Sequence, residues 1–381
     1  LINQKLFTEE KIENIKASIK KEINIAIEKA FNESPIECDL DFEKSSVFRH
    51  HNFKQIQPTD KKNNIRFVDS ISQGLRQSLE KFDNLIFMGQ DIAEYGGVFK
   101  ISEGFVDLFG KDRIRNTPIC ESAIVSLALG LSVKGYKSVV EMQFADFVSS
   151  GFNPIVNNLA KIHYRWGQCA DVVVRMPCGA GVGAGPFHSQ TNEAWFTHTP
   201  GLKVVYPAFP YDAKGLLISS IEDPNPVMFF EHKALYRTSK QEVPENYFNI
   251  PLGKANFIKR GHNLSIITFG MGVHWALDYL SQNDVSVDLL DLRTLVPLDL
   301  ESIKESVVKT GKVLILQEDN NRGGFGSDIS SYISENLFEY LDAPIIKVSS
   351  LDTPIPFTES LEKNYLANSR LAKAIKNLID Y

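Results

Sequence analysis

Cysteines are scarce in this sequence and long hydrophobic runs are absent, and each shortage excludes a class of protein. The four cysteines among 381 residues form no C-x-x-C pair and are too few for a disulfide scaffold, which favours a reducing compartment. No apolar stretch approaches the roughly 20 residues that a membrane-spanning helix needs. Residues 1–30 also lack the charged start and apolar core of a signal peptide. We therefore predict a cytoplasmic protein that has no membrane partner.

Net charge and several common catalytic motifs are lacking as well. A net charge of −6 is small for this length, so the composition does not indicate nucleic acid as a partner. The motifs G-x-S-x-G and H-E-x-x-H and the P-loop are absent, which disfavours the common hydrolases, metalloproteases and nucleotidases. What is present is the composition of a globular protein, 43% apolar and 23% charged, long enough for two domains.

The first 43 residues carry the pattern of one long helix. Thr8 is able to cap the helix start, and Glu9 and Glu10 then lie in its positive first turn. Apolar residues follow at helical spacing and stop before Ser34, at Ile12, Ile15, Ile19, Ile23, Ala26 and Ala30. This apolar face has to pack on something. Residues 44–64 are polar without any period, and they predict a linker.

Two runs of alternating strands and helices follow the linker. The first run has predicted strands at 84–89, 137–142, 171–175, 203–206 and 226–231 and helices at 68–82, 122–133, 152–163 and 212–221. After a segment with little periodicity at 241–253, the second run has strands at 264–269, 285–292, 312–317 and 344–348 and a last helix at 361–378. Such alternation predicts an α/β fold with two doubly wound, mostly parallel sheets, in domains 65–240 and 241–381.

Glu121 stands at the start of the predicted helix 122–133. A glutamate in this position commonly does no more than interact with the helix dipole. The helix is apolar nearly all round, however, and we expect it to be buried. A buried helix would draw its leading carboxylate into a partly desolvated site, so Glu121 is a candidate functional residue.

A glycine-rich run at 178–190 follows a predicted strand and contains G-x-G-x-x-A from Gly179. A dinucleotide-binding fingerprint requires a helix that opens directly on the glycines, whereas here Pro186 and a polar loop follow. We therefore reject a nicotinamide site. The glycines instead predict close approach of the backbone to a ligand or a neighbouring chain, with His188 at the tip. A lone loop histidine is more often structural than catalytic.

Two further segments precede loops or helices where ligands commonly bind. Residues 141–147 end a predicted buried strand and lead into a loop, the usual place for ligand contacts in an open α/β sheet. Phe147 in this segment has the alternative role of a simple core residue. Residues 323–326 precede a predicted helix at 327–340, where they either bind an anion at the helix start or form a tight turn.

Seven segments resemble, in order, the beta subunits of the branched-chain 2-oxo acid and pyruvate dehydrogenases: 89–99, 116–121, 141–147, 188–190, 200–205, 212–217 and 291–297. The resemblance covers about Asn64 to Tyr381 and implies transketolase-like pyrimidine-binding and C-terminal domains. The tail, with Leu6-Phe-Thr-Glu-Glu before its helix and Glu33-Ser-Pro after it, resembles the end of the alpha subunit. We therefore expect a fragment of an alpha–beta fusion.

The resemblance implies a thiamine diphosphate site that two chains share. In this family the alpha subunit holds the Mg²⁺-diphosphate end of the cofactor, and the beta subunit holds the aminopyrimidine. By motif position, Glu121 matches the glutamate that bonds the pyrimidine ring nitrogen, and Phe147 matches the ring that stacks on the pyrimidine. Gln143 is a nearby candidate contact. His188 matches a histidine that handles the decarboxylated intermediate and its transfer to lipoamide.

Two observations concern metal sites, and a third is a departure from the family at position 90. Asp223 and Asn225 match a loop that binds K⁺ through backbone carbonyls in some relatives. The G-D-G signature of the Mg²⁺-diphosphate site occurs nowhere in the sequence, so we expect an alpha part to supply it. Relatives usually have glutamate where this chain has Gln90, which puts any role of that glutamate in doubt.

The predicted function is oxidative decarboxylation of a branched-chain 2-oxo acid of the 2-oxoisovalerate type, with acyl transfer to the lipoyl arm of an acyltransferase. Alternatives within the class are pyruvate and acetoin dehydrogenases. From other classes we keep a transketolase-type transferase and a non-catalytic module that dimerises and docks the acyltransferase. The isolated chain is expected to be a homodimer with little affinity for thiamine diphosphate.

Overall fold

The computed structural model describes residues 7–381 and divides the chain into two compact units, residues 1–45 and 46–381. Residues 1–6 of the predicted tail, with Leu6 of its alpha-like motif, lie outside the described part. In the first unit, α1 (Glu9–Phe31) begins after Thr8, whose hydroxyl accepts a hydrogen bond from Lys11 N at 3.2 Å, as predicted. The short helix α2 (Leu40–Ser45) follows. Within the first unit, none of the residues of α1 is buried.

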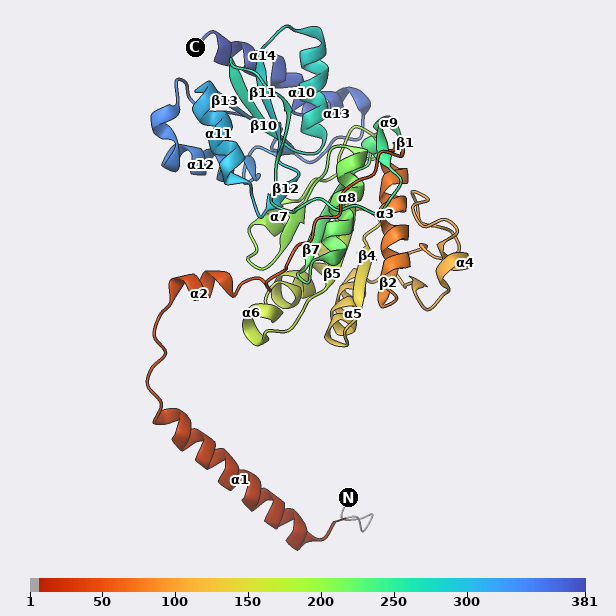
Figure 1. The fold of residues 1–381 in the computed structure, drawn as a ribbon, viewed down its shortest axis with the longest axis vertical. Coiled ribbons are helices and arrows are strands. Elements are labelled where there is room, and N and C mark those ends of the chain that lie inside the picture. Colours follow the sequence, from red (N-terminus) through yellow and green to blue (C-terminus); the bar gives the residue numbers. More distant parts are fainter. Residues whose placement is uncertain (1–6) are drawn as a thin grey trace. The chain divides into compact units, whose positions relative to one another are not determined.

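A seven-stranded sheet forms the centre of the second unit, in the order β12-β6-β7-β5-β4-β2-β3 (Figure 1). Its strands are β2 (Leu85–Gly89), β3 (Ile114–Asn116), β4 (Lys137–Glu141), β5 (Val172–Cys178), β6 (Lys203–Val205), β7 (Val227–His232) and β12 (Thr294–Val296). All neighbours are parallel except β12, which pairs antiparallel with β6. Because β12 comes from the second predicted domain, this sheet joins the two domains.

Helices cover both faces of this sheet (Figure 1). One face packs on α3 (Phe67–Lys81) and α8 (Pro210–Glu222), and the other on α5 (Glu121–Val133) and the short helices η1 (Ala145–Gly151) and η2 (Pro154–Leu159). Successive strand residues alternate between these cores: Phe87 and Val139 face α3 and α8, whereas Met88 and Val140 face α5. The sheet is therefore doubly wound, as predicted.

The second sheet has five strands in the order β14-β13-β10-β11-β9. They are β9 (Asn256–Lys259), β10 (Leu264–Thr268), β11 (Val287–Asp291), β13 (Val313–Asn320) and β14 (Ile346–Ser350), and β9 alone runs antiparallel. Its core residues pack against α10 (Met271–Gln282) and α14 (Asn368–Ile379) on one face, and α11 (Leu300–Thr310) and α12 (Gly326–Asn336) on the other. This arrangement confirms the second α/β domain.

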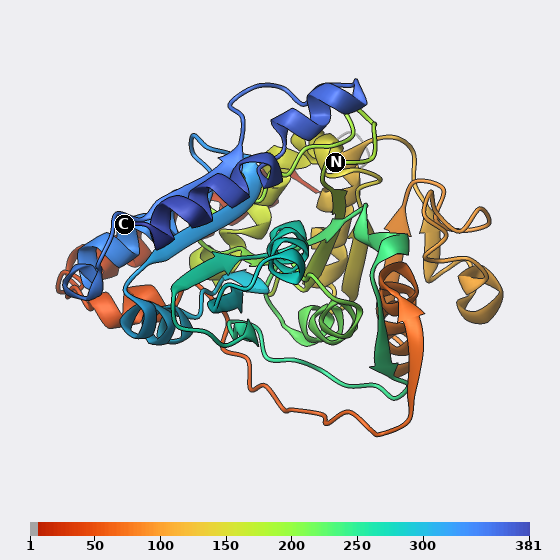
Figure 2. The same cartoon turned by 90° about the horizontal axis from the view of Figure 1, so that it is seen from above.

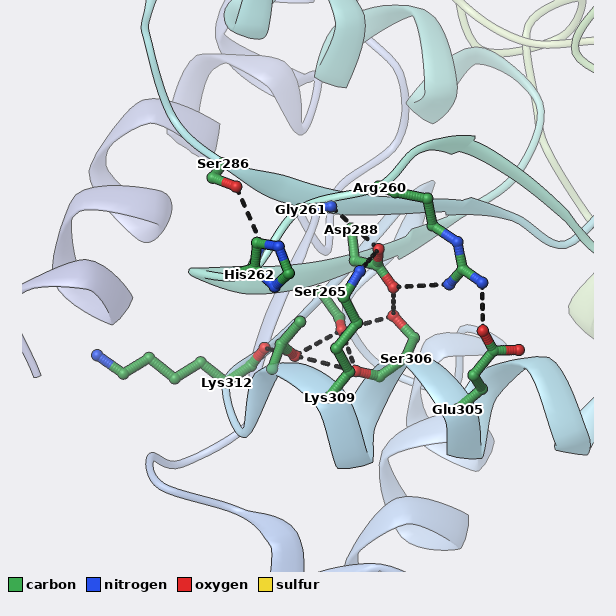
Figure 3. A network of polar contacts seen from close by, with 11 residues as sticks. Arg260, Gly261, His262, Ser265, Ser286, Asp288, Glu305, Ser306, Lys309 and Lys312 are labelled. Carbon is green, nitrogen blue, oxygen red and sulfur yellow. Dashed lines mark hydrogen bonds and ion pairs between the residues drawn. The ribbon is translucent and has the colours of Figure 1, made fainter.

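A buried carboxylate near the start of β11 ties that strand to α11 (Figure 3). Asp288 accepts hydrogen bonds from Gly261 N at 3.1 Å, Ser306 Oγ at 2.9 Å and Lys309 Nζ at 2.9 Å, and Arg260 Nη1 lies at 3.3 Å. Burial alone would raise the pKa of Asp288, but these hydrogen bonds and the Lys309 charge outweigh burial and lower it. The network therefore holds the start of β11 against α11.

Several predicted elements differ from the structure. The predicted helical stretch 152–163 is helical in the structure, but it is not one regular α-helix. The helical path already begins at η1, widens its hydrogen-bond spacing in the π-helix η2, and continues as α6 (Ile162–Trp166). The predicted last helix is two helices, α13 (Glu359–Tyr365) and α14, separated by extended backbone at Leu366. Short elements that were not predicted are α4 (Phe105–Phe109), α7 (Ala194–Thr197) and α9 (Leu235–Thr238). The predicted helix 327–340 ends as α12 at Asn336 and is followed by the short helix η3 (Phe338–Tyr340).

The segment predicted as a linker follows a defined path across the second unit. Asn225 accepts a hydrogen bond from Arg49 N at 2.7 Å and donates one to Arg49 O at 2.9 Å. Asn249 accepts a hydrogen bond from Ile56 N at 2.7 Å. The segment then enters β1 (Lys62–Arg66), which pairs antiparallel with β8 (Lys240–Pro244); Figure 2 shows β1 in orange beside β8 in green. Among residues 7–381, no helix combines the length and the apolar character that crossing a bilayer requires.

Candidate functional site at the carboxyl edge of the first sheet

The residues predicted to contact the cofactor or the intermediate, and Gln90, follow the carboxyl ends of neighbouring parallel strands. Gln90 follows β2, Glu121 follows β3, Gln143 and Phe147 follow β4, and His188 lies in the loop after β5. Parallel strands end at one edge of a sheet, and ligands of open α/β sheets bind at that edge. The fold thus places side chains that are up to about a hundred residues apart in sequence on one edge of one sheet.

Glu121 is the first residue of α5 and is only 8% exposed. Its Oε1 atom accepts a hydrogen bond from Gln90 Nε2 at 3.1 Å, and Gln90 is buried as well. Within residues 7–381 this is the one hydrogen bond that the Glu121 side chain makes, so its second oxygen remains available to a ligand. A Cβ added at Gly151 would lie 3.3 Å from Glu121 O, which shows how closely η1 packs on the start of α5.

The expectation that α5 is buried all round is wrong. One side of the helix is buried, with Ile124, Val125 and Ala128 in the core, whereas Leu127 is 51% exposed. The sequence of α5 is apolar on both faces. Only one of these faces packs against the described residues of this chain. The sequence of an apolar helix does not show whether each apolar face packs on the core of the same chain or on another chain.

Three rings form the second part of the site. The Phe144 and Phe147 ring centroids lie 5.6 Å apart, and the His188 ring lies 4.8 Å from Phe144 and 5.4 Å from Phe147, all in edge-to-face geometry. Phe147 and His188 are half-buried, so Phe147 is not a simple core residue. Sequence reasoning missed Phe144, although a second aromatic residue three positions before Phe147 was visible in the segment 141–147.

Gln143 connects the two parts. Its Nε2 atom lies 3.4 Å from Asp91 Oδ2, and Asp91 directly follows Gln90 with a φ of 57°. The loop after β2, which carries the partner of Glu121, is therefore tied to the loop after β4, which carries Phe147. This contact links the loop of Gln90 to the loop of Phe147.

A buried ion cluster that sequence reasoning missed lies beneath these loops. The Arg175 guanidinium contacts Glu141 at 2.6 Å and Glu231 at 2.7 Å, and Tyr236 Oη donates a hydrogen bond to Glu231 at 2.7 Å. Burial raises the pKa of Glu141, while the Arg175 charge acts in the opposite direction. Because the three charged residues stand on β4, β5 and β7, the cluster fixes the strand ends from which the site loops depart.

The glycines after β5 make room for side chains of this same chain. Gly179 has a φ of 92°, and a Cβ there would lie 2.1 Å from His232 Nε2. Gly185 has a φ of 70°, and a Cβ there would lie 2.4 Å from the Phe357 ring. At these two positions the close neighbour is thus neither a ligand nor another chain, which corrects the expectation from sequence. Both glycines are required by their backbone conformation and by the space available.

The other two predicted binding segments already have protein partners. Asp223 pairs with Lys203 at 2.5 Å and accepts a hydrogen bond from Asn225, whose amide also holds the segment before β1. The K⁺ loop at Asp223 and Asn225 therefore stays a prediction. At 323–326, Gln317 Oε1 accepts a hydrogen bond from Gly326 N at 2.6 Å, so a side chain occupies the helix start and favours the tight-turn alternative.

Comparisons with known proteins agree with this geometry. The transketolase pyrimidine-binding domain model matches residues 63–239, and the transketolase C-terminal domain model matches residues 253–370. The 2-oxoisovalerate dehydrogenase subunit beta of Bacillus subtilis (strain 168) is 40% identical over 324 residues, 83% of this chain and 99% of that protein. The pyruvate dehydrogenase E1 component subunit beta of the same organism is 40% identical over 311 residues, 80% of this chain and 95% of that protein.

A solved structure supports the fold independently. A split-gene transketolase, described as an inactive beta4 tetramer, superposes with a TM-score of 0.67 at 21% identity and covers 84% of this chain and 99% of that chain. At this identity the likeness shows the fold alone. The predicted transketolase-like architecture of two α/β domains is therefore confirmed.

Proposed function

This chain belongs to the family of 2-oxo acid dehydrogenase beta subunits, and we propose that it binds the aminopyrimidine of thiamine diphosphate at Glu121 during oxidative decarboxylation of a branched-chain 2-oxo acid. The observation that carries this proposal is the buried Glu121 carboxylate, which accepts a hydrogen bond from Gln90 at one oxygen and follows a strand at the same edge of the sheet as Phe147 and His188. As partners we propose an alpha-type subunit, a second copy of this chain and a lipoyl acyltransferase, in the cytoplasm.

The residues present fit the pyrimidine end of the cofactor. An aminopyrimidine is flat and carries ring nitrogens, so it suits a buried carboxylate with one free oxygen next to aromatic rings. The diphosphate end needs a metal site. Within residues 7–381, no group of three or more His, Cys, Asp or Glu side chains is placed to hold a metal ion. We therefore assign the Mg²⁺-diphosphate end to the alpha-type partner.

Each residue of the site has a distinct chemical task in this proposal. Thiamine diphosphate, when bound, supplies a carbon nucleophile. Glu121 exchanges a proton with the pyrimidine ring nitrogen, and Gln90 keeps the carboxylate oriented through its hydrogen bond. Phe147 provides an apolar surface that excludes water. His188 supplies a ring nitrogen that can donate or accept a proton during decarboxylation and acyl transfer.

The choice of a branched-chain acid rests on two observations. Residues 118–121 and 143–146 resemble the branched-chain type more than the pyruvate type. A cavity of about 420 Å³ beside Phe144 is lined mainly by apolar side chains, which suits a branched hydrocarbon tail: Val68, Val98, Phe99, Val182, Ala184 and Tyr236 contribute to it. In the assembled enzyme, 2-oxoisovalerate should have a higher kcat/KM than pyruvate; the reverse order would favour the pyruvate alternative.

Replacing Glu121 with Gln in the assembled enzyme tests the catalytic role. Because an amide cannot exchange the required proton, we expect kcat to fall by about a hundredfold or more, with folding unchanged by circular dichroism. Wild-type turnover in this variant would instead support the non-catalytic docking module. Assays with a lipoyl domain and with an aldose as acceptors separate the dehydrogenase from a transketolase-type transferase, since only the former should acylate the lipoyl domain.

A further inference from the structure

The loop that carries His188 cannot form the backbone hydrogen bonds of a helix or a strand. Gly179, Gly181, Gly183 and Gly185 all have positive φ, between 70° and 92°. A chain with a left-handed residue at every second position makes neither a helix nor a strand, so its N–H groups need partners from elsewhere. Successive N–H groups in such turns commonly converge on one anion.

That anion is a carboxylate of the C-terminal domain. Glu362, in α13, is only 3% exposed. Its Oε1 atom accepts a hydrogen bond from Gly181 N at 2.9 Å, and its Oε2 atom accepts one from Gly183 N at 3.2 Å. Hydrogen bonds to an ionised acceptor are stronger than those between neutral groups. Both carboxylate oxygens of Glu362 are thus used to hold two alternate residues of the loop.

Two more buried charges hold the start of the loop. Glu318, in β13, accepts a hydrogen bond from Ala180 N at 2.6 Å and contacts His232 Nε2 at 2.6 Å through its other oxygen. Lys233 Nζ donates a hydrogen bond to Gly179 O at 2.7 Å and lies 5.6 Å from the centroid of the Phe144 ring, which contacts the His188 ring. At the far end of the loop, Gln190 N donates a hydrogen bond to Asp146 Oδ1 at 3.2 Å.

We propose that Glu362 is a positioning residue: it fixes the loop that carries His188 from the C-terminal domain, and thereby sets the place of the His188 ring against Phe144 and Phe147. The role of His188 in acyl transfer rests on the proposed function, whereas the restraint on the loop rests on the contacts alone. The C-terminal domain then affects catalysis without contacting the substrate, because Glu362 accepts hydrogen bonds from two backbone N–H groups of the loop that carries His188.

Hydrogen exchange of the full chain tests the restraint without any cofactor. Glu362→Gln is nearly isosteric, but its amide nitrogen cannot accept the hydrogen bond that one carboxylate oxygen accepts now. We expect peptides that cover residues 179–190 to exchange about tenfold faster or more, with the melting temperature and the other peptides little changed. The matched control is Glu359→Gln, in the same helix, whose side chain is 79% exposed and forms an ion pair with Lys363. Unchanged exchange at 179–190, or a uniform rise across the chain, would overturn the proposal.

Kinetics in the assembled enzyme separate positioning from general stability. Glu362→Gln should lower kcat for acylation of a lipoyl domain about tenfold, leave KM for the 2-oxo acid and the affinity for thiamine diphosphate unchanged, and be partly rescued by Glu362→Asp. A parallel change in KM and cofactor affinity would contradict positioning. If His188→Ala retains full activity while Glu362→Gln still loosens the loop, the proposed role of His188 fails and the restraint itself stands.

Discussion

Gln90 presents an amide to Glu121 where a glutamate would present a second carboxyl group. The amide donates its N–H to Glu121 Oε1 at 3.1 Å. Two carboxyl groups in the same place would have to share a proton or repel each other. An amide at position 90 is a neutral donor to Glu121, whereas a glutamate there would couple the two carboxyl groups.

Replacing Gln90 with Glu should move the pH dependence of cofactor binding. A second carboxyl group beside Glu121 raises the pKa of one of the pair, so ionisation then requires a higher pH. We expect the apparent pKa for thiamine diphosphate binding by the assembled enzyme to rise by about one unit or more, measured by calorimetry across pH. Gln282→Glu, at the exposed end of α10, is the control and should leave the profile in place. A profile that does not move in Gln90→Glu would show that the two side chains titrate independently.

Asp288 allows a prediction of how folding stability depends on pH. In contrast to the raised pKa expected in Gln90→Glu, the pKa of Asp288 is lowered. Its pKa is lowered in the folded chain, so it contributes stability above the pKa of the unfolded state, and this contribution is lost as pH falls through the folded value. Asp288→Asn should cost about 1–3 kcal/mol in urea unfolding at pH 7 and much less at pH 3. Asp284→Asn, at an exposed position before β11, should change neither value. Equal losses for Asp288→Asn at both pH values would show that charge is not the cause.

At the scale of elements, the central strands could be predicted and the edge elements could not. β4, β5 and β7 are buried on both faces, which leaves apolar runs in the sequence. β1 carries polar residues that are mostly exposed, and its only strand partner is β8, so it has no two-residue period to detect. The defined path of the segment before β1 depends on Asn225, which lies 176 residues from its partner Arg49.

The site divides in the same way. Phe147 and His188 could be placed at one edge from sequence, because each follows a predicted parallel strand and such strands end at one edge. Glu121 follows β3, which was not predicted as a strand, so its place beside them came from the resemblance alone. The ring cluster around Phe144 could not be predicted, since its rings come from two loops, those after β4 and β5, and each ring could equally have entered the core. The restraint by Glu362 was beyond sequence reasoning, because Gly181 and its acceptor are 181 residues apart and stand in different domains.

At the scale of the whole molecule, the two α/β domains of residues 46–381 are interlocked rather than merely linked. β12 of the second domain extends the first sheet, and Glu318 and Glu362 of the second domain hold the loop after β5 of the first. A cavity of about 730 Å³ lies between the segment 186–195 and the C-terminal domain, and neither Glu121 nor His188 lines it. The candidate site is therefore an edge that this chain forms on its own but does not enclose.

An unenclosed edge predicts weak cofactor binding by the chain alone. It offers contacts to a pyrimidine ring, while no cluster of acidic or histidine ligands within residues 7–381 is placed to hold the Mg²⁺ of the diphosphate. In calorimetry with Mg²⁺, thiamine diphosphate should bind residues 1–381 at least about a hundredfold more weakly than it binds the complex with an alpha-type subunit, a difference of about 2.7 kcal/mol. Glu121→Gln should weaken binding to the complex and change the already weak binding to the single chain little. Tight, Mg²⁺-dependent binding by this chain alone would contradict the division of the site between two chains, and would place a diphosphate clamp among its own residues.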